Sequence, residues 1–254
     1  MERIRLNDSV SLSRIIQGFW HITDWKRSPQ ENLDFVNECL KLGVTSFDIA
    51  EIYGDYEAES VFGEVLKLDP ALRSKIEIIT KTGINMASSK RPYTMGHYDT
   101  SYERIVSSCK TSLKKMNTDY IDVFLIHRED PLIDHEEVAR ALNDLKDQGL
   151  IKSYGVSNFD PFKFEALQAA TGNKLVTNQI EWNPLVFEHV SNGNLDVLQK
   201  HHVAPMIWSP LAQGQLFNPN KPKALKVAEV LETLAKKYQA QPETIAFAYL
   251  LKHP

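Results

Sequence analysis

Short apolar runs rich in β-branched residues alternate along the chain with longer amphipathic segments. Each short run is nearly continuous in its hydrophobicity, which is typical of parallel strands that helices bury on both faces. The alternation therefore predicts an α/β protein with a parallel sheet. The seven predicted strands are residues 14–19, 44–49, 76–81, 120–126, 151–157, 175–180 and 203–208.

The segments between the predicted strands have helical periodicity and helical boundary signals. Residues 28–43 begin with Ser28 as a candidate N-cap, followed by Pro29 in the first turn and by Glu31 three residues after the cap. Gly43 marks the predicted end of this helix. Comparable helical segments are residues 99–116, 134–149, 222–238 and 242–252.

The strands recur at a regular interval of about 31 residues, and the chain has 254 residues, which suits a (β/α)8 TIM barrel. A doubly wound sheet has the same alternation. However, no predicted strand is followed by a GxGxxG or a GxxxxGK[S/T] motif. We therefore predict a single barrel domain over residues 1–254, with seven of the barrel strands visible in this sequence.

The composition narrows the class of function. A net charge of −4 and a pI of about 6.1 argue against nonspecific binding to nucleic acid or to an anionic membrane. The two cysteines, Cys39 and Cys109, lie in helix-like segments without a CxxC motif or a metal-ligand neighbour. The sequence has no signal-peptide pattern and no apolar run of membrane-spanning length. We expect a cytoplasmic protein that binds a small molecule and no metal.

Polar side chains stand at the carboxyl ends of the second to the seventh predicted strands. The ends of parallel barrel strands meet at one rim, where active sites are built, so these side chains are predicted to lie together. They are Asp48, Lys81, His127, Ser157, Asn158, Gln179, Glu181, Trp208 and Ser209.

One combination of rim residues suits proton transfer to a carbonyl oxygen. Tyr53 follows the second strand, and a phenol with a pKa of about 10 is a poor donor near neutrality unless a cation lowers that pKa. We expect Lys81 to lower the pKa of Tyr53, and Asp48 to keep Lys81 charged. We expect His127 to donate a hydrogen bond to the substrate oxygen. None of these side chains supplies a hydride, so a cofactor is implied.

Other strand-end residues suit the binding of such a cofactor. Ser157, Asn158 and Gln179 offer paired donors and acceptors for a carboxamide, and Trp208 offers a surface for stacking on a flat ring. Each rim residue taken alone also has a structural explanation, such as a turn, a helix cap or core packing.

The motifs that contain these residues resemble the aldo-keto reductase family over nearly the whole chain. The matching segments are FDIAEIYG, IITKTG, DYIDVFLIHREDP, GVSNF, NQIEWNP and WSPLAQGQL. The resemblance implies a (β/α)8 barrel that reversibly reduces an aldehyde or ketone with NADP(H), while NAD(H) stays open. It assigns the catalytic tetrad of the family to Asp48, Tyr53, Lys81 and His127.

The same resemblance implies a set of binding residues. Gln215 stands where many relatives carry a basic residue. The substrate is expected to contact Trp20, Trp25, Tyr53 and His127. The implied cofactor-binding residues are Phe19, Trp20, Asp48, Ser157, Asn158, Gln179, Trp208, Ser209, Pro210 and Leu211.

Aromatic residues near the rim suggest the substrate class. We expect Trp20, Trp25, Tyr56 and Trp182 to line the mouth of the barrel, and the loop over residues 85–99 is long enough to reach across it. Such a lining favours small apolar or aromatic aldehydes over charged substrates.

Two functions from other classes stay open. The chain could bind the cofactor as a redox-sensing or scaffolding subunit with negligible turnover. It could also be a metal-dependent hydrolase that uses Asp48 and His127, although that function requires more His and Asp residues at strand ends.

The last part of the sequence lacks one expected element. A closed barrel of this class has eight strands, but only helical runs follow Trp208. In the family that the chain resembles, an eighth strand and a helix that holds the adenosine end of the cofactor come next. We expect a C-terminal tail beyond residue 254. A truncation, or completion of the barrel by a neighbouring chain, are the alternatives.

Overall fold

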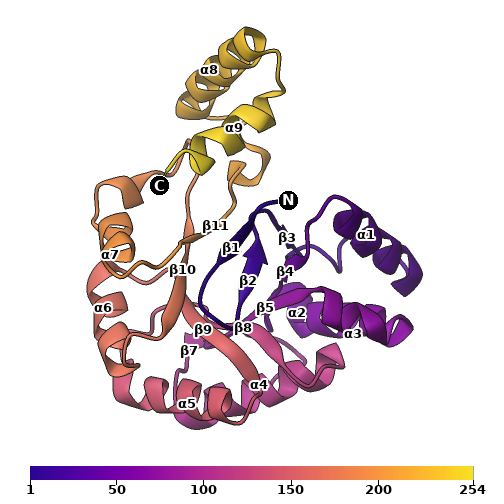
Figure 1. Cartoon of the computed structure of the whole chain (residues 1–254), viewed down its shortest axis with the longest axis vertical. Coiled ribbons are helices and arrows are strands. Elements are labelled where there is room, and N and C mark those ends of the chain that lie inside the picture. Colours follow the sequence, from indigo (N-terminus) through magenta and orange to yellow (C-terminus); the bar gives the residue numbers. More distant parts are fainter. Residues whose placement is uncertain (254) are drawn as a thin grey trace. The chain divides into compact units, whose positions relative to one another are not determined.

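The computed structural model describes residues 1–253. Seven parallel strands form one sheet in the order β11-β10-β9-β8-β5-β4-β3 (Figure 1). All seven predicted strands are confirmed, with bounds that differ from the prediction by a few residues at the ends. The strands are β3 (Ile16–Gly18), β4 (Ser46–Asp48), β5 (Glu77–Thr82), β8 (Ile121–Ile126), β9 (Ile151–Ser157), β10 (Leu175–Glu181) and β11 (Met206–Trp208).

The chain forms two compact units, and strand β10 passes from one to the other. The N-terminal unit comprises Met1–Asn178, and the C-terminal unit begins at Gln179. The organisation as a single domain stays a prediction.

Five helices of the N-terminal unit lie along one side of its strands (Figure 1). The predicted start of the first helix is confirmed, because the Ser28 hydroxyl accepts the backbone N–H of Glu31 and the Glu31 carboxylate accepts the backbone N–H of Ser28. Gly43 follows the helix with a φ of 80°, a conformation that favours glycine. The five helices are α1 (Pro29–Lys41), α3 (Ala58–Leu68), α4 (Tyr102–Met116), α5 (His135–Asp147) and α6 (Pro161–Ala170).

Several short elements were not predicted. Elements of two to four residues are too short to show a hydrophobic period, so the sequence pattern does not reveal them. They include the antiparallel pair β1–β2, which precedes the main sheet in sequence, and the antiparallel pair β6–β7, which lies between β5 and β8. They also include the single turn of helix that carries Tyr53. Their bounds are β1 (Arg3–Arg5), β2 (Ser11–Ser13), α2 (Tyr53–Tyr56), β6 (Ile84–Asn85) and β7 (His97–Tyr98).

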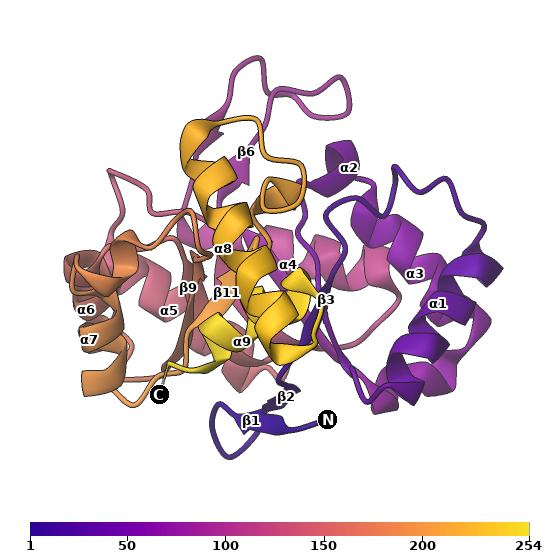
Figure 2. The ribbon, with the colours of Figure 1, turned by 90° about the horizontal axis from the view of Figure 1, so that it is seen from above.

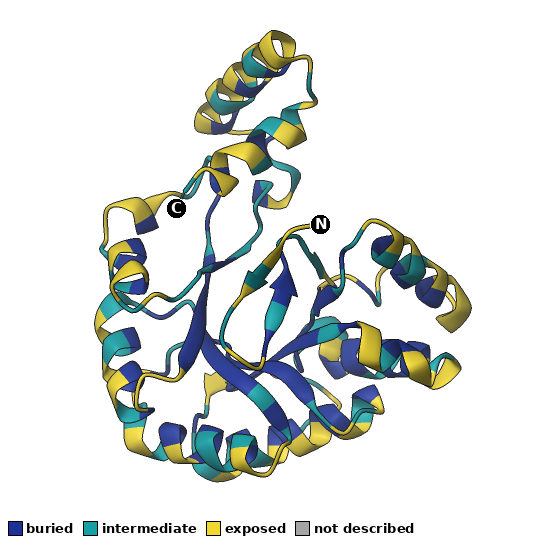
Figure 3. Ribbon diagram, viewed as in Figure 1, coloured by how far each residue is buried: buried dark blue, intermediate teal, exposed yellow. Residues whose placement is uncertain are grey.

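The strands of the N-terminal unit form the core of that unit (Figure 3). All six residues of β8 are buried, which explains why its sequence is almost continuously apolar. The exception is Asp122, a buried carboxylate that is paired with Arg73 and Lys152. Burial on both faces therefore holds the strand ends, where the polar residues stand, in fixed positions.

The C-terminal unit contains the end of β10, strand β11 and three helices, of which α8 and α9 lie side by side (Figure 2). The predicted helical runs at 222–238 and 242–252 are confirmed, and no strand occurs from residue 209 to residue 253. Within residues 1–253, no helix has both the length and the hydrophobicity needed to span a membrane. The three helices are α7 (Asn194–Lys200), α8 (Pro222–Tyr238) and α9 (Pro242–Leu251).

Candidate active site

A buried ion pair joins the ends of two neighbouring strands. Lys81 on β5 is fully buried, and its Nζ donates to Asp48 Oδ1 at 2.5 Å and to the carbonyl oxygen of Ile49 at 2.8 Å. Burial alone lowers the pKa of Lys81, but the charge and hydrogen bond of Asp48, together with Tyr53, leave this pKa above its ordinary value. Lys81 is therefore a charged ammonium, as the sequence predicts.

The phenol of Tyr53 lies next to that ammonium. Its hydroxyl is 3.4 Å from Lys81 Nζ, and Lys81 Nζ is 5.1 Å from the centre of the Tyr53 ring. Burial raises the pKa of Tyr53 more than the charge of Lys81 lowers it, so this pKa lies above 10. The expectation that Lys81 brings the pKa of Tyr53 below its ordinary value is therefore wrong for the protein alone. The direction of the Lys81 contribution agrees with the expectation, but the linear sequence does not reveal how deeply the phenol is buried.

His127 completes the group of four residues. It follows β8, and its backbone N–H donates to the Thr82 carbonyl oxygen at 2.8 Å. Its ring meets the Tyr53 ring edge to face, with 5.8 Å between the ring centres. Burial, followed by the charges of Lys81 and Arg128, holds the pKa of His127 well below 6.5. The imidazole is therefore neutral at pH 7 and can both donate and accept a hydrogen bond.

One ring nitrogen of His127 is buried without a hydrogen-bond partner. Among residues 1–253, no side chain or backbone group bonds to its Nδ1. A buried polar atom left unpaired is unfavourable by roughly 1–3 kcal/mol.

The end of β9 offers a hydroxyl and an amide side by side. Asn158 has a left-handed backbone with a φ of 58°, and its Nδ2 donates to Ser157 Oγ at 2.7 Å and to the His127 carbonyl oxygen at 3.3 Å. These bonds fix the amide group next to His127, which directly follows β8. Such a donor and acceptor set fits the carboxamide of a nicotinamide ring.

Five of the predicted cofactor residues belong to the C-terminal unit, namely Gln179, Trp208, Ser209, Pro210 and Leu211. Gln179 is buried on β10, where its Cα pairs with that of Met206, and Trp208 ends β11. The chain then turns at Ser209, whose backbone is left-handed with a φ of 47° and whose carbonyl oxygen accepts from Asn183 Nδ2 at 3.1 Å. Pro210 and Leu211 follow in the same turn.

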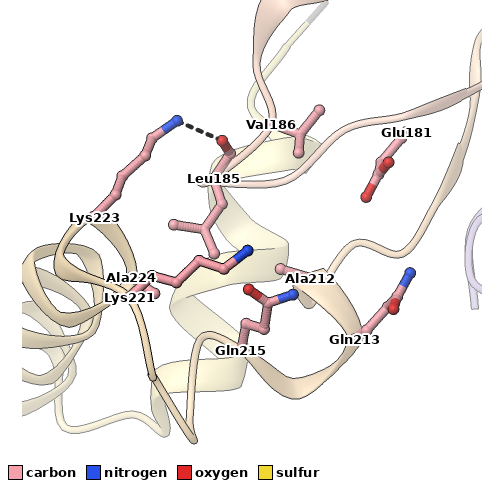
Figure 4. Close-up of a pocket in the computed structure, with 9 residues that line it drawn as sticks. All are labelled: Glu181, Leu185, Val186, Ala212, Gln213, Gln215, Lys221, Lys223 and Ala224. Carbon is pink, nitrogen blue, oxygen red and sulfur yellow. Dashed lines mark hydrogen bonds between the residues drawn. The ribbon is translucent and has the colours of Figure 1, made fainter.

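A pocket of about 280 Å³ opens beside this turn in the C-terminal unit (Figure 4). Gln215 lines the pocket, and Lys221 points toward it (Figure 4). Lys223 also lines the pocket, with its Nζ donating to the Leu185 carbonyl oxygen at 2.6 Å. Neither lysine was predicted to contribute to a site, although the sequence KPK at 221–223 brings two cations close together.

Only some of the aromatic residues predicted to line the mouth of the barrel are exposed to solvent. Trp20 is exposed, stacks on His21, and lies 6.3 Å from the Tyr53 ring between ring centres. Tyr56 and Trp182 are buried, so the expectation that they line an open mouth is wrong. Apolar packing within each unit accounts for their burial, since aromatic rings contribute most when they are removed from water.

Two further predicted residues belong to an aromatic cluster. Phe19 is buried and stacks on Phe47, with 5.4 Å between ring centres. Trp25 packs edge to face on both Phe19 and Phe35. Contacts of Phe19 with cofactor and of Trp25 with substrate stay predictions.

A second buried ion pair, which was not predicted, involves a residue two positions before Tyr53. Glu51 is buried, and its Oε1 accepts from Arg104 at 2.6 Å and from the Thr82 hydroxyl at 3.2 Å. Its Oε2 accepts from the Ser108 hydroxyl at 2.7 Å. The signal was the glutamate inside the otherwise apolar stretch FDIAEIYG. Among residues 1–253, no cluster of three or more His, Cys, Asp or Glu side chains could hold a metal ion.

Comparisons of the sequence with known proteins agree with these observations. The profile of the Aldo/keto reductase family matches residues 14–254. The chain is 43% identical to a 6-dehydroglucose reductase of Agrobacterium fabrum and 41% identical to the uncharacterized oxidoreductase YcsN of Bacillus subtilis. Each match covers 100% of this chain and 85% of the relative. A methylglyoxal reductase DkgA of Yersinia pestis is 33% identical over 89% of this chain and 72% of that protein.

Solved structures lead to the same family. The thermostable aldo-keto reductase Tm1743 has a TM-score of 0.82 and 26% identity, over 100% of this chain and 86% of that one. The glycerol dehydrogenase AKR11B4 of Gluconobacter oxydans has a TM-score of 0.84 and 25% identity, over 98% and 82%. The predicted fold class, a (β/α)8 barrel with seven strands in this sequence, is confirmed. The chain belongs to the aldo/keto reductase family.

Proposed function

We propose that the chain reduces aldehydes or ketones to alcohols with a hydride from NADPH, and that Tyr53 protonates the carbonyl oxygen. The observation that carries this proposal is the buried ammonium of Lys81, bonded to Asp48 and placed 3.4 Å from the Tyr53 hydroxyl. The family assignment and the reductases among the relatives support carbonyl reduction as the activity.

In this mechanism each of the four residues has a separate role in the transfer of a proton to the carbonyl oxygen. Bound NADPH supplies the hydride that reduces the carbonyl carbon. Tyr53 gives its phenolic proton to the carbonyl oxygen, so that hydride and proton together yield the alcohol. Lys81 stabilises the phenolate that remains on Tyr53, and Asp48 orients Lys81. Neutral His127 donates a hydrogen bond to the same carbonyl oxygen.

The proposed contacts with the cofactor include the residues predicted to bind its nicotinamide ring. Ser157, Asn158 and Gln179 would hold the carboxamide of the nicotinamide, and Trp208 would stack on its ring. The other proposed cofactor contacts are Phe19, Trp20, Asp48, Ser209, Pro210 and Leu211. The preference for NADP(H) over NAD(H) is part of the proposal.

For the substrate we propose a small carbonyl compound that approaches Tyr53 and His127 beside the exposed indole of Trp20, with Trp25 as a further contact. The proposal extends to a cytoplasmic protein whose partner is this small molecule rather than a nucleic acid or a membrane. Purified protein should first be assayed with aromatic aldehydes, methylglyoxal and 6-dehydroglucose, each with NADPH and with NADH.

The decisive variant is Tyr53→Phe, which removes one oxygen and keeps the ring. Turnover on the best substrate should fall by roughly 10² or more, the usual loss when an acid catalyst is removed. Binding of NADPH, followed by its fluorescence, should stay unchanged. Tyr102→Phe is the matched control, because the Tyr102 hydroxyl bonds to Asp144 at 2.8 Å, between helices α4 and α5. Near-normal turnover of Tyr53→Phe would refute the proposal.

A further inference from the structure

The turn directly after Tyr53 has an unfavourable backbone. Gly54, Asp55 and Tyr56 all have left-handed conformations, with φ values of 57°, 52° and 68°. A Cβ on Gly54 would lie 2.4 Å from the Thr23 side chain, so only glycine fits there. The left-handed region is unfavourable for the other two residues, above all for a bulky tyrosine. Such a turn persists only where its surroundings hold it in place.

The hydroxyl of Tyr56 provides the first of these contacts. The backbone N–H of Met86 donates to the Tyr56 hydroxyl at 2.7 Å, and that hydroxyl is 3.3 Å from the Met86 carbonyl oxygen, to which it donates. Tyr56 is buried, so little water competes for these bonds. Met86 begins the loop that joins β6 to β7, which we define as the 86–96 loop. One phenol thus fastens the base of this loop to the turn.

Charged residues of the 86–96 loop make the second set of contacts. Lys90 Nζ donates to the Asp55 carbonyl oxygen at 3.3 Å and lies 3.0 Å from the Glu57 carboxylate. The Arg91 guanidinium lies over the Tyr56 ring, 4.5 Å from its centre. Lys90, Asp55 and Glu57 are exposed, so these ion pairs contribute less than the buried phenol and weaken with salt.

A third connection joins the base of the 86–96 loop to the residues that precede Tyr53 in sequence. Arg104 bonds through one guanidinium nitrogen to the Glu51 carboxylate at 2.6 Å and through its Nε to Asn85 Oδ1 at 3.0 Å. Glu51 precedes Tyr53 by two residues, and Asn85 on β6 directly precedes the loop. The base of the loop is therefore bonded to the chain both before and after Tyr53.

We propose that Tyr56 is a positioning residue: through its hydroxyl, order in the 86–96 loop determines whether the Tyr53 hydroxyl stands beside Lys81. This inference rests on the proposed role of Tyr53 as the acid. When the contact between Tyr56 and Met86 opens, the left-handed turn relaxes and the Tyr53 hydroxyl leaves its place 3.4 Å from Lys81. A ligand that orders the loop therefore also prepares the acid.

The test is Tyr56→Phe in the full chain, measured by two independent methods. Amide hydrogen exchange at Met86 should become faster by about tenfold or more, since that N–H loses its acceptor. The kcat should fall by about tenfold, because misplacement of an acid by a fraction of an ångström is enough for such a loss. The KM and the affinity for NADPH should change by less than about twofold on the same reasoning.

Tyr154→Phe is the matched control. It also removes a buried phenol oxygen, which bonds to Asn143 at 2.8 Å on the α5 side of β9. This control should alter neither Met86 exchange nor kcat. If Tyr56→Phe accelerates Met86 exchange but keeps the kcat of the Tyr154→Phe control, the coupling does not exist.

If Tyr56→Phe folds poorly, a second variant tests the same coupling between the 86–96 loop and Tyr53. Lys90→Gln leaves the buried phenol intact and removes the exposed ion pairs with Asp55 and Glu57, together with the Lys90 ammonium that donates to the Asp55 carbonyl oxygen. It should lower kcat at low salt by a smaller factor and match the parent chain at high salt. Equal kcat values at low salt would count against the coupling. Failure of the proposed function has a different signature, which is near-normal turnover in Tyr53→Phe whatever the state of the loop.

Discussion

At the scale of single residues, Lys81 organises the candidate site. Its ammonium has three oxygen neighbours, which belong to Asp48, Ile49 and Tyr53. Burial of an ammonium is unfavourable, and these oxygens compensate for the lost hydration. Burial of Tyr53 raises the pKa of its own hydroxyl, so the phenol stays protonated at neutral pH and has a proton to donate.

The two titrating groups of the site predict a broad pH range for carbonyl reduction. Tyr53 must be protonated, and its pKa lies above 10. His127 must be neutral, and its pKa lies well below 6.5. The kcat/KM for reduction, which reports the groups of the unliganded protein, should therefore stay constant between about pH 7 and 9. Initial rates at low substrate concentration across this range provide the measurement. A decline of kcat/KM with a midpoint near pH 8 would contradict the prediction.

The residues of the tetrad could be predicted from the sequence, whereas their ionisation could not. Asp48, Lys81 and His127 stand at strand ends, and strand ends are visible as the points where apolar runs stop. The pKa of Tyr53 depends on how much water reaches its hydroxyl, which is decided by residues distant in sequence. The burial of Tyr56 also depends on residues distant in sequence. The sequence therefore places Tyr56 at an open mouth, whereas in the structure it is buried and bonded to the 86–96 loop.

At the scale of elements, strand and helix periodicity predicted the main sheet well. The exceptions are elements held by side-chain contacts rather than by a hydrophobic pattern. The short 3₁₀ helix Pro70–Lys75 is one of these, because its Arg73 reaches across to the start of β8. There the guanidinium bonds to Asp122, to the Tyr120 carbonyl oxygen and to the Thr118 hydroxyl. Asp122 also accepts the Ile78 backbone N–H of β5 at 2.9 Å, so this cluster joins two strands.

Removal of Arg73 should destabilise the fold strongly. In Arg73→Ala the buried Asp122 carboxylate keeps only Lys152 as an ionic partner. Loss of one member of a buried ion pair lowers the free energy of unfolding by about 3 kcal/mol. Urea unfolding measures this change.

The matched comparison is Lys67→Ala, which breaks the exposed pair between Lys67 and Glu64 on helix α3. An exposed pair contributes about 0–1 kcal/mol. Equal losses of unfolding free energy in Arg73→Ala and Lys67→Ala would show that the buried cluster is not a structural support.

At the scale of the whole molecule, the chain divides into two compact units with the boundary inside β10, and the single barrel domain stays a prediction. The local hydrophobic period does not report on contacts between distant segments, so this division was not visible in the sequence.

Stability is a property of the whole chain, and two buried groups, His127 and Glu59, give the free energy of unfolding opposite pH dependences. His127 has a lowered pKa, so the unfolded chain binds its proton first, and stability falls as the pH drops below 6.5.

Glu59 acts in the opposite direction. It is fully buried on helix α3, its Oε1 accepts from the Thr80 hydroxyl at 2.7 Å, and burial raises its pKa above 4.5. A raised pKa means that the folded chain binds the proton more tightly. The stability that Glu59 provides is therefore complete below pH 4.5 and is lost as the pH rises through its folded pKa.

Glu59→Gln should remove this loss, because glutamine has a similar volume and stays neutral. Relative to the parent chain, the melting temperature of Glu59→Gln should rise as the pH increases above about 4.5 toward the folded pKa of Glu59. Thr80→Val is the complementary variant: the Thr80 hydrogen bond lowers the pKa of Glu59, so its removal raises this pKa further and should deepen the loss of stability at neutral pH. Thermal unfolding of the three proteins at several pH values measures both effects. If Glu59→Gln matched the parent chain at pH 5 and was less stable at pH 8, Glu59 would have to be an ionised, stabilising carboxylate in the folded protein.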